Sequence, residues 1–194
     1  MDTVGPLLRA YRAVEPRADS VRKLDLLLDL EPGEDPRILP FLLGVLGDGG
    51  EPESVRMSVL SRLRDAPVAD SHHRSIGDAM RQVLLTEPVD GELCLQAALA
   101  LGTFTDVDGV VDALGVVLTN AAAPIELRYN AFTSLYVRGP TSESLALLRR
   151  VRADETLGPC ARGLLAAWGF GSTDSTGSTE STDSTGSTEQ GGTG

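Results

Sequence analysis

Apolar residues recur along this chain in two families of short segments that alternate with each other. The first family comprises VRKLDLLLDL at 21, VRMSVLSRLR at 55, LCLQAALALG at 93, LRYNAFTSLY at 127 and CARGLLAAWG at 160. Their starts lie 34, 38, 34 and 33 residues apart. A period of this length is typical of a protein built from repeated supersecondary units.

The second family lies between the segments of the first: ILPFLLGVL at 38, IGDAMRQVL at 76, VVDALGVVL at 110 and SLALLRRVR at 144. Both families have helical spacing. In the segment at 93, for example, Leu93, Ala97 and Leu101 fall on one face, because residues four apart are neighbours on a helix. The sequence therefore predicts an all-α chain of helical hairpins, with a unit of about 34 residues.

Polar residues mark where the helices begin. Asp106, Ser71 and Thr141 or Ser142 are predicted N-caps of second helices, because their side-chain oxygens can accept hydrogen bonds from a first turn. The second unit is four residues longer between its two helices, and the extra residues are predicted in the turn at 65–71. Such an insertion either extends a binding face or is simply tolerated on the surface.

The two ends of the repeat array differ from its middle. Residues 6–14 predict an N-terminal capping helix, and residues 160–168 predict half a unit, whose core Trp168 would close. Ends with a polar outer face keep a finite stack of repeats in solution. We therefore expect one domain over residues 1–170.

The composition changes abruptly at Gly171, after which only Gly, Ser, Thr, Asp, Glu and Gln occur. The nonapeptide STDSTGSTE is present twice, at 172–180 and 181–189. No apolar side chain is available whose burial could offset the entropy of ordering this segment, so we expect 171–194 to be disordered. The simpler interpretation is a solvated tail, and a second one is a site of Ser/Thr modification that adds charge.

Charge and hydropathy exclude several classes of partner. The net charge is −11, and four acids in the tail, without a basic residue, leave −7 on the rest of the chain. Binding to nucleic acid needs clustered cations, so we expect no nucleic-acid partner. No apolar run approaches the length of about 18 residues that crosses a membrane, and the first residues lack the pattern of a signal peptide. We expect a cytoplasmic protein without a membrane partner.

No group of residues has the pattern of a catalytic or metal site. Residues 106–109, Asp-Val-Asp-Gly, begin like a calcium loop, but valines stand where that loop needs an acid, a glycine and a glutamate. His72 and His73 are neighbours that point about 100° apart on a helix, so they suit exposed positions at a helix start better than a metal site. The sequence predicts no cofactor, no metal and no enzymatic activity.

Cys94 and Cys160 are the only cysteines. We expect both to be small buried residues, which is the usual place of a free cysteine. They lie two units apart, and helices that pack about 8–10 Å from one another would hold them too far apart for a disulfide.

The openings V-R-x-x at 55, L-R-x-x-A at 127 and A-A-L-A-L-G at 97–102 resemble the short bacterial HEAT repeats, which are also called phycobilisome-lyase-like. The resemblance covers residues of about 20–169 and holds in both helices of the unit. Cys94 and Ala161 depart from it, since arginine is usual there. The resemblance implies an α-solenoid of about four and a half helical hairpins, whose second helices line a concave face; fold alone does not fix function.

In such a stack, second-helix residues that face away from the core form the concave surface. We expect a partner to contact Asp78, Arg81, Gln82, Asp112, Val116, Arg149 and Arg150 there, with Pro40, Leu43, Gly44, Gly115 and Ala146 beside them. Their mixed charge and small apolar patches suit a protein or peptide. The arginines at 149, 150 and 152 are either a solvated helix end or an anchor for an acidic partner.

The leading hypothesis for function is a non-catalytic scaffold or adaptor that binds another protein on this face. The resemblance also implies an alternative, a bilin-lyase-like enzyme or accessory subunit, which would need a ligand-sized concavity and an activated side chain. A third hypothesis, a DNA-repair HEAT enzyme, is disfavoured by the negative charge and by the lack of a basic stripe.

Overall fold

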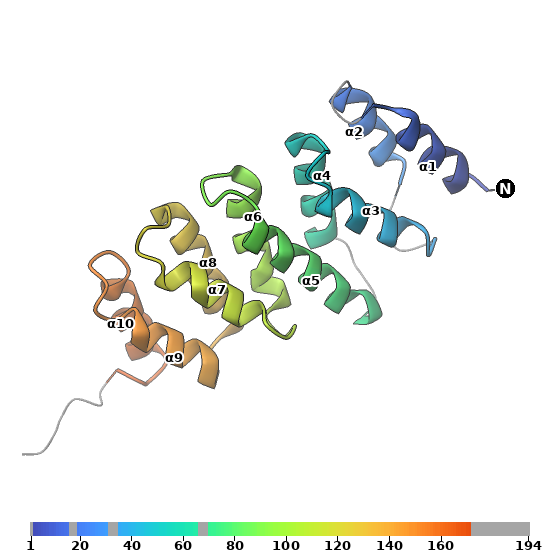
Figure 1. Cartoon of the computed structure of the whole chain (residues 1–194). Helices are drawn as coiled ribbons and strands as arrows, with labels where there is room; N and C mark the ends of the chain where they lie inside the picture. The colour runs from blue at the N-terminus through green and yellow to red at the C-terminus, as the bar shows by residue number, and fades with distance from the viewer. Residues whose placement is uncertain (1, 16–18, 31–34, 66–69, 172–194) are drawn as a thin grey trace, which may run out of the picture.

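The computed structural model describes residues 2–15, 19–30, 35–65 and 70–171, and within these ranges the regular secondary structure is helical throughout (Figure 1). The helices are α1 (Val4–Ala13), α2 (Ser20–Leu28), α3 (Ile38–Gly47), α4 (Glu53–Asp65), α5 (Asp70–Thr86), α6 (Glu92–Ala100), the 3-10 helix η1 (Leu101–Phe104), α7 (Val110–Thr119), α8 (Ile125–Arg138), α9 (Ser142–Arg150) and α10 (Gly158–Ala167). Every segment of the two apolar families forms a helix, which confirms the prediction of an all-α chain. The tail that is expected to be disordered lies, from residue 172 on, outside the described residues.

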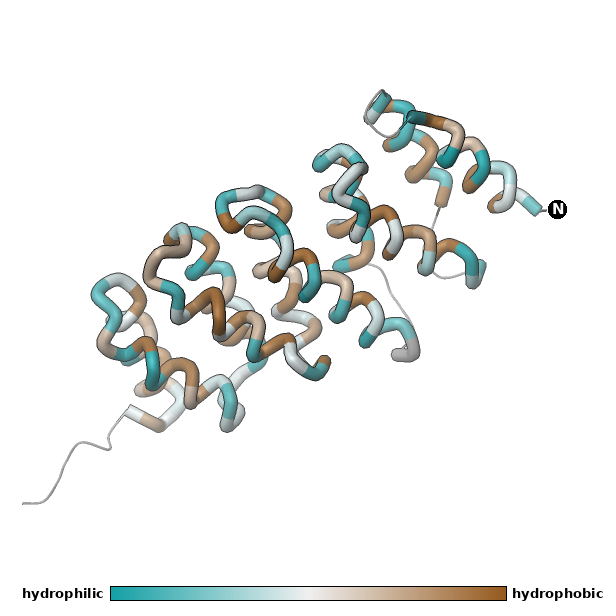
Figure 2. Tube along the Cα trace, in the orientation of Figure 1, coloured by the Kyte–Doolittle hydropathy of each residue, from teal (hydrophilic) through white to brown (hydrophobic). Residues whose placement is uncertain are grey.

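The helices pack in two rows (Figure 1). In one row α2, α4, α6 and α8 contact one another in chain order, and in the other row α3, α5, α7 and α9 do the same. Contacts of α3 with α4, α5 with α6, α7 with α8 and α9 with α10 join the rows. Apolar positions recur along the helices (Figure 2), and Leu42, Met80, Leu114 and Leu148 of the second row are completely buried. The core therefore lies between the two rows.

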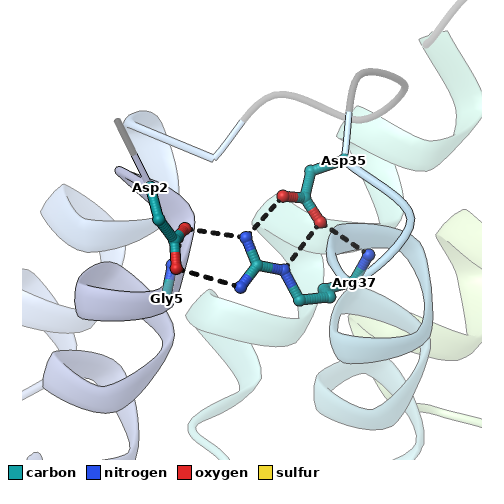
Figure 3. Close-up of polar contacts among 4 residues, drawn as sticks. All are labelled: Asp2, Gly5, Asp35 and Arg37. Atoms are coloured by element: carbon teal, nitrogen blue, oxygen red, sulfur yellow. Dashed lines mark hydrogen bonds and ion pairs between the residues drawn. The ribbon is translucent and has the colours of Figure 1, made fainter.

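The N-terminal helix α1 stands beside α3. Its first residues are tied to the start of α3, where Arg37 donates to both carboxylate oxygens of Asp2 at 2.7 and 3.2 Å and also binds Asp35 (Figure 3). Near its other end, the ring of Tyr11 packs edge-on against Phe41 of α3, with centroids 5.0 Å apart. A residue further along α1 thus contacts a residue further along α3, so the two helices run in the same direction. In this position α1 takes the place that a preceding second helix would occupy.

Buried arginines of the first row fix the junctions between units. Arg56 on α4 donates from Nε to the carbonyl oxygen of Leu46 at 2.8 Å and pairs with Glu87 at 2.6 Å. Arg128 on α8 donates in the same way to Leu118 and pairs with Asp154. These two arginines are only 5% and 4% exposed. Each one satisfies a carbonyl in the last turn of a helix, where no partner within the helix exists.

Two further residues make the same backward contact over ten residues, and they correct the phase of the last unit. Cys94 donates from Sγ to the Leu84 carbonyl at 3.7 Å, and Arg162 donates to the Arg152 carbonyl at 2.7 Å. The equivalent positions are thus 56, 94, 128 and 162, so the last spacing is 34 and not 33. Arg162, rather than Ala161, therefore makes the contact that Arg56 and Arg128 make.

This correction explains why Cys160 is exposed, contrary to the expectation that both cysteines are buried. A shift of one residue turns a helix face by about 100°. Cys94, whose phase was right, is buried as expected. Trp168 is partly buried against the core at the end of α10.

One of the predicted N-caps is confirmed and two are wrong. Thr141 caps α9 in a reciprocal pair with Ser144. Asp106 is not a cap, because α7 begins at Val110 after Gly109, which has a φ of 78°. Ser71 lies inside α5, which begins at Asp70. The extra length of the second unit is therefore partly a longer helix, while residues 66–69 of the predicted turn lie outside the described residues.

Within the part of the chain that the structure describes, no helix is long and apolar enough to cross a membrane.

Candidate protein-binding face

The predicted contact residues lie on α5, α7 and α9, on the side away from the core; we call this surface, with the exposed residues of α3, the second-helix face. Gln82, Asp112, Val116, Arg149 and Arg150 are exposed, while Asp78 and Arg81 are half-buried. Val116, with 62% of its surface exposed, is the largest apolar contribution among them. Five of the seven predicted residues are thus exposed on their helices, and their contact with a partner stays a prediction.

Gly115 does not belong to this face. It is buried, and a Cβ there would lie 2.7 Å from Cδ2 of Leu147 on α9. The glycine therefore allows the close approach of α7 and α9 instead of contacting a partner. Of the other flanking residues, Pro40, Gly44 and Ala146 are exposed and Leu43 is half-buried.

Arg81 is already engaged within the protein. Its guanidinium pairs with Asp78, one turn earlier on α5, at 3.1 Å. It also lies beside Gly109 at the start of α7, where Nη1 is 3.6 Å from the position of a Cβ. Arg81 thus bridges two neighbouring units, and this reduces what it can offer to a partner.

The middle of the face is acidic. Asp112 shares a hollow of about 220 Å³ with Asp106, Asp108 and Glu143, and Arg138 is the basic residue that lines it. Among the described residues, no group of His, Cys, Asp and Glu has the arrangement of a metal site. The hollow therefore contributes negative charge to the face, without a coordination geometry of its own.

His73 and Arg74, in the extended first turns of α5, bind this acidic region across the junction between units. His73 Nε2 lies 2.8 Å from Asp106 Oδ1, and Arg74 lies 3.4 Å from Asp108. The imidazole also stacks on Phe104 at 4.7 Å, so His73 is half-buried and not the exposed residue that was expected. The hydrogen bond from His73 lowers the pKa of Asp106. The partners are 33 and 34 residues apart in the chain, close to the spacing of the apolar segments.

The C-terminal end of the face is basic. Arg149 and Arg150 end α9, and Arg149 lines a hollow of about 90 Å³ with Arg152, Arg162, Leu165 and Phe170. We call Arg149, Arg150, Arg152 and Arg162 the arginine end. Arg149, Arg150 and Arg162 have no ion-pair partner in the described ranges. The charge on the second-helix face is therefore unevenly distributed, negative in the middle and positive at this end.

A cleft between α1 and α3 is a feature that the sequence did not indicate. It has a volume of about 370 Å³ and is lined by Pro40, Phe41 and Gly44 on one side and by Tyr11 and Arg12 on the other. At its base Lys23 binds both oxygens of Glu51, at 2.6 and 2.8 Å, and lies 4.7 Å from the centre of the Tyr11 ring.

The Tyr11 hydroxyl in this cleft is buried and has no hydrogen-bond partner among the described residues. Burial, and then the charge of Glu51, raise the pKa of Tyr11. The paired ammonium of Lys23 and the hydroxyl of Tyr11 thus place polar groups in the wall of the cleft.

The opposite row also exposes apolar side chains. Tyr129, Tyr136 and Val137 on α8 are exposed, Tyr136 by 58%. Tyr129 and Tyr136 are seven residues apart and therefore lie on the same face of α8.

No protein-family model, curated protein or solved structure matches this chain.

Proposed function

We propose that this chain is a non-catalytic scaffold, an α-solenoid of about four and a half HEAT-type helical hairpins that binds another protein on its second-helix face. The two rows of helices and the recurring contact of residues 56, 94, 128 and 162 support the repeat assignment. The observation that carries the binding role is the arginine end, where Arg149 and Arg150 are exposed and without an ion-pair partner in the described residues.

The layout of charge suggests how a partner would be oriented. An acidic segment of the partner would lie at Arg149 and Arg150, and a basic segment would lie near Asp112. Val116, on the intervening helix α7, would provide an apolar contact. Complementary charges mainly determine the rate and specificity of association, while desolvated apolar contacts provide much of the affinity. A protein surface offers this combination of groups more readily than a nucleic acid, whose charge is of one sign.

A comparative pull-down tests the proposal. The full-length wild type, Arg149→Glu/Arg150→Glu and Arg9→Glu are immobilised, and retained proteins are compared by quantitative mass spectrometry. Arg9 is an exposed arginine on α1, outside the face, and serves as the matched control. The proposal predicts a protein that is retained by the wild type and by Arg9→Glu but lost from the double variant. Equal retention by all three would contradict it.

The cleft between α1 and α3 favours the second candidate, a lyase-like accessory protein. Its volume of about 370 Å³ is within the range of small-molecule sites, which is roughly 300–1,000 Å³. Gly44 lines this cleft, and a Cβ there would meet no atom within 4 Å, so Gly44→Trp should fill the cleft without disturbing the core. A titration with a linear tetrapyrrole, followed by visible absorption, should then saturate with the wild type and not with Gly44→Trp. No change in the spectrum of the wild type would remove this candidate.

A further inference from the structure

At the arginine end, Arg149, Arg150 and Arg162 have no ion-pair partner among the residues that the structure describes. Arg149 and Arg150 project from the last turn of α9, and Arg162 donates from one of its nitrogens to the Arg152 carbonyl at 2.7 Å. That bond leaves most of the donors of the Arg162 guanidinium for other acceptors. Asp154, which follows α9, is half-buried and pairs with Arg128. An anionic segment is therefore what this surface fits.

The chain itself continues from this surface. After α10 the backbone reverses at Gly169, which has a φ of 83°, and Phe170 donates back to the Leu165 carbonyl at 2.7 Å. Both Phe170 and Gly171 line the hollow at the arginine end. Residue 172, the first of the tail, thus follows directly on a residue that lies against these arginines.

The composition of the tail matches the surface in charge. It contains Asp174, Glu180, Asp183 and Glu189 and no basic residue, and the acids of its two identical nonapeptides recur every nine residues. A segment that is joined to its binding site by a short connection has an effective concentration in the millimolar range. Contacts that are individually weak then suffice for substantial occupancy.

We propose that the acidic tail, residues 172–194, binds the arginine end of its own chain. The tail then competes with any acidic partner for Arg149 and Arg150, and phosphorylation of its serines or threonines would strengthen its hold by adding charge. The competition rests on the proposed function, because it concerns the same arginines, whereas the contact between tail and arginines does not.

The sign of a salt effect tests the contact. Dyes are attached to Cys160, which is exposed on α10, and to Thr193→Cys, in a full-length chain in which the buried Cys94 is replaced by serine. Residues two apart on a helix point about 160° away from each other, so the dye at 160 does not cover Arg162. Bound acidic tail should be released by salt, and energy transfer should fall between about 20 mM and 1 M salt. An unbound acidic tail repels itself, so salt would contract it and energy transfer would rise.

Two variants and one control complete the design. Arg149→Glu/Arg150→Glu should reduce the transfer at low salt to its value at high salt, and Arg9→Glu should not. The tail variant Asp174→Asn/Glu180→Gln/Asp183→Asn/Glu189→Gln should have the same effect as the arginine variant. Because it changes no residue of the helices, its result holds even if the arginine variant unfolds.

Transfer that rises with salt, or that is insensitive to the tail variant, would overturn the proposal. These outcomes leave the proposed function standing if the pull-down depends on the arginines. Conversely, a tail that binds as expected, with a pull-down that does not depend on them, removes the proposed function alone.

Discussion

Nε of Arg56 donates a hydrogen bond of 2.8 Å to the carbonyl oxygen of Leu46, ten residues earlier and in the last turn of α3. The last carbonyls of a helix lack partners within the helix, and they form the negative end of its dipole. A cation is therefore favourable at this place for two reasons. Arg128 repeats the arrangement at the end of α7, and each arginine has as a second partner an acid that follows the next helix in the chain.

Replacement of Arg56 by methionine should lower the free energy of unfolding by on the order of 3 kcal/mol. The substitution leaves the Leu46 carbonyl and Glu87 without their partner, and loss of one member of a buried ion pair typically costs about 3–5 kcal/mol. Arg22→Met, at an exposed position of α2, should cost less than about 0.5 kcal/mol. Urea denaturation of both variants measures the difference. Equal stability of the two would mean that the junction does not depend on this arginine.

The helices, and in most segments the side that each one buries, could be predicted from the sequence, because a period of about 3.6 residues is visible in the apolar segments. The predicted alignment was wrong by one residue in the segment at 160, because that sequence fits two alignments. In CARGLLAAWG both Cys160 and Ala161 are small enough for a core position, and only the bond of Arg162 to Arg152 decides between them. One residue of error was enough to place Cys160 inside.

The Asp2 carboxyl should titrate near pH 2 in the native protein. The Arg37 guanidinium, followed by the backbone N–H of Gly5, lowers the pKa of Asp2 to about 2. Because the folded value is below the unfolded one, this contact stabilises the protein above the ordinary pKa of about 4, and its contribution is lost as the pH falls through about 2. In Arg37→Ala the pKa should rise toward its ordinary value. NMR titration of the carboxyl carbon measures both, and an unchanged pKa in the variant would exclude the contact.

Alanine in place of glycine should have opposite effects at two helical positions. Alanine favours a helix over glycine by about 1 kcal/mol. At Gly44 a Cβ would meet nothing within 4 Å, so Gly44→Ala should raise stability by about 0.5–1 kcal/mol. At Gly77 a Cβ would lie 2.9 Å from Cγ2 of Val107 and 3.1 Å from Cβ of Phe104. Both atoms are close to the backbone and cannot easily move aside, so Gly77→Ala should lower stability by about 1–3 kcal/mol. Thermal and urea unfolding of the pair decide the matter. If Gly77→Ala were the more stable variant, the packing of α5 on the turn before α7 would be wrong.

One thiol per native chain should react rapidly with an aromatic disulfide reagent. Cys160 is exposed, whereas Cys94 is buried, and burial raises the pKa of the Cys94 thiol and suppresses its thiolate. A second thiol should appear only in denaturant. Two fast thiols, or none, would contradict the assigned phases of α6 and α10.

The contact face was predicted less completely than the helices. Spacing along one helix indicates which residues are exposed, and this held for Asp112, Val116, Arg149 and Arg150. It does not indicate what the neighbouring helix contributes. The burial of Gly115 under Leu147, and the contact of Arg81 with the start of α7, depend on distances between helices that no local pattern contains.

The central claim is that an acidic partner associates through Arg149 and Arg150. Its most direct test is the association rate of the partner recovered by the pull-down, measured by stopped flow at low salt with the wild type, Arg149→Glu/Arg150→Glu and Arg9→Glu. Reversal of charges that steer a partner typically slows association by roughly tenfold or more, and exposed substitutions change stability by less than about 0.5 kcal/mol. The account predicts a rate that is about tenfold lower for the double variant alone, with unchanged unfolding. A double variant that is fully folded and associates as fast as the wild type would contradict it.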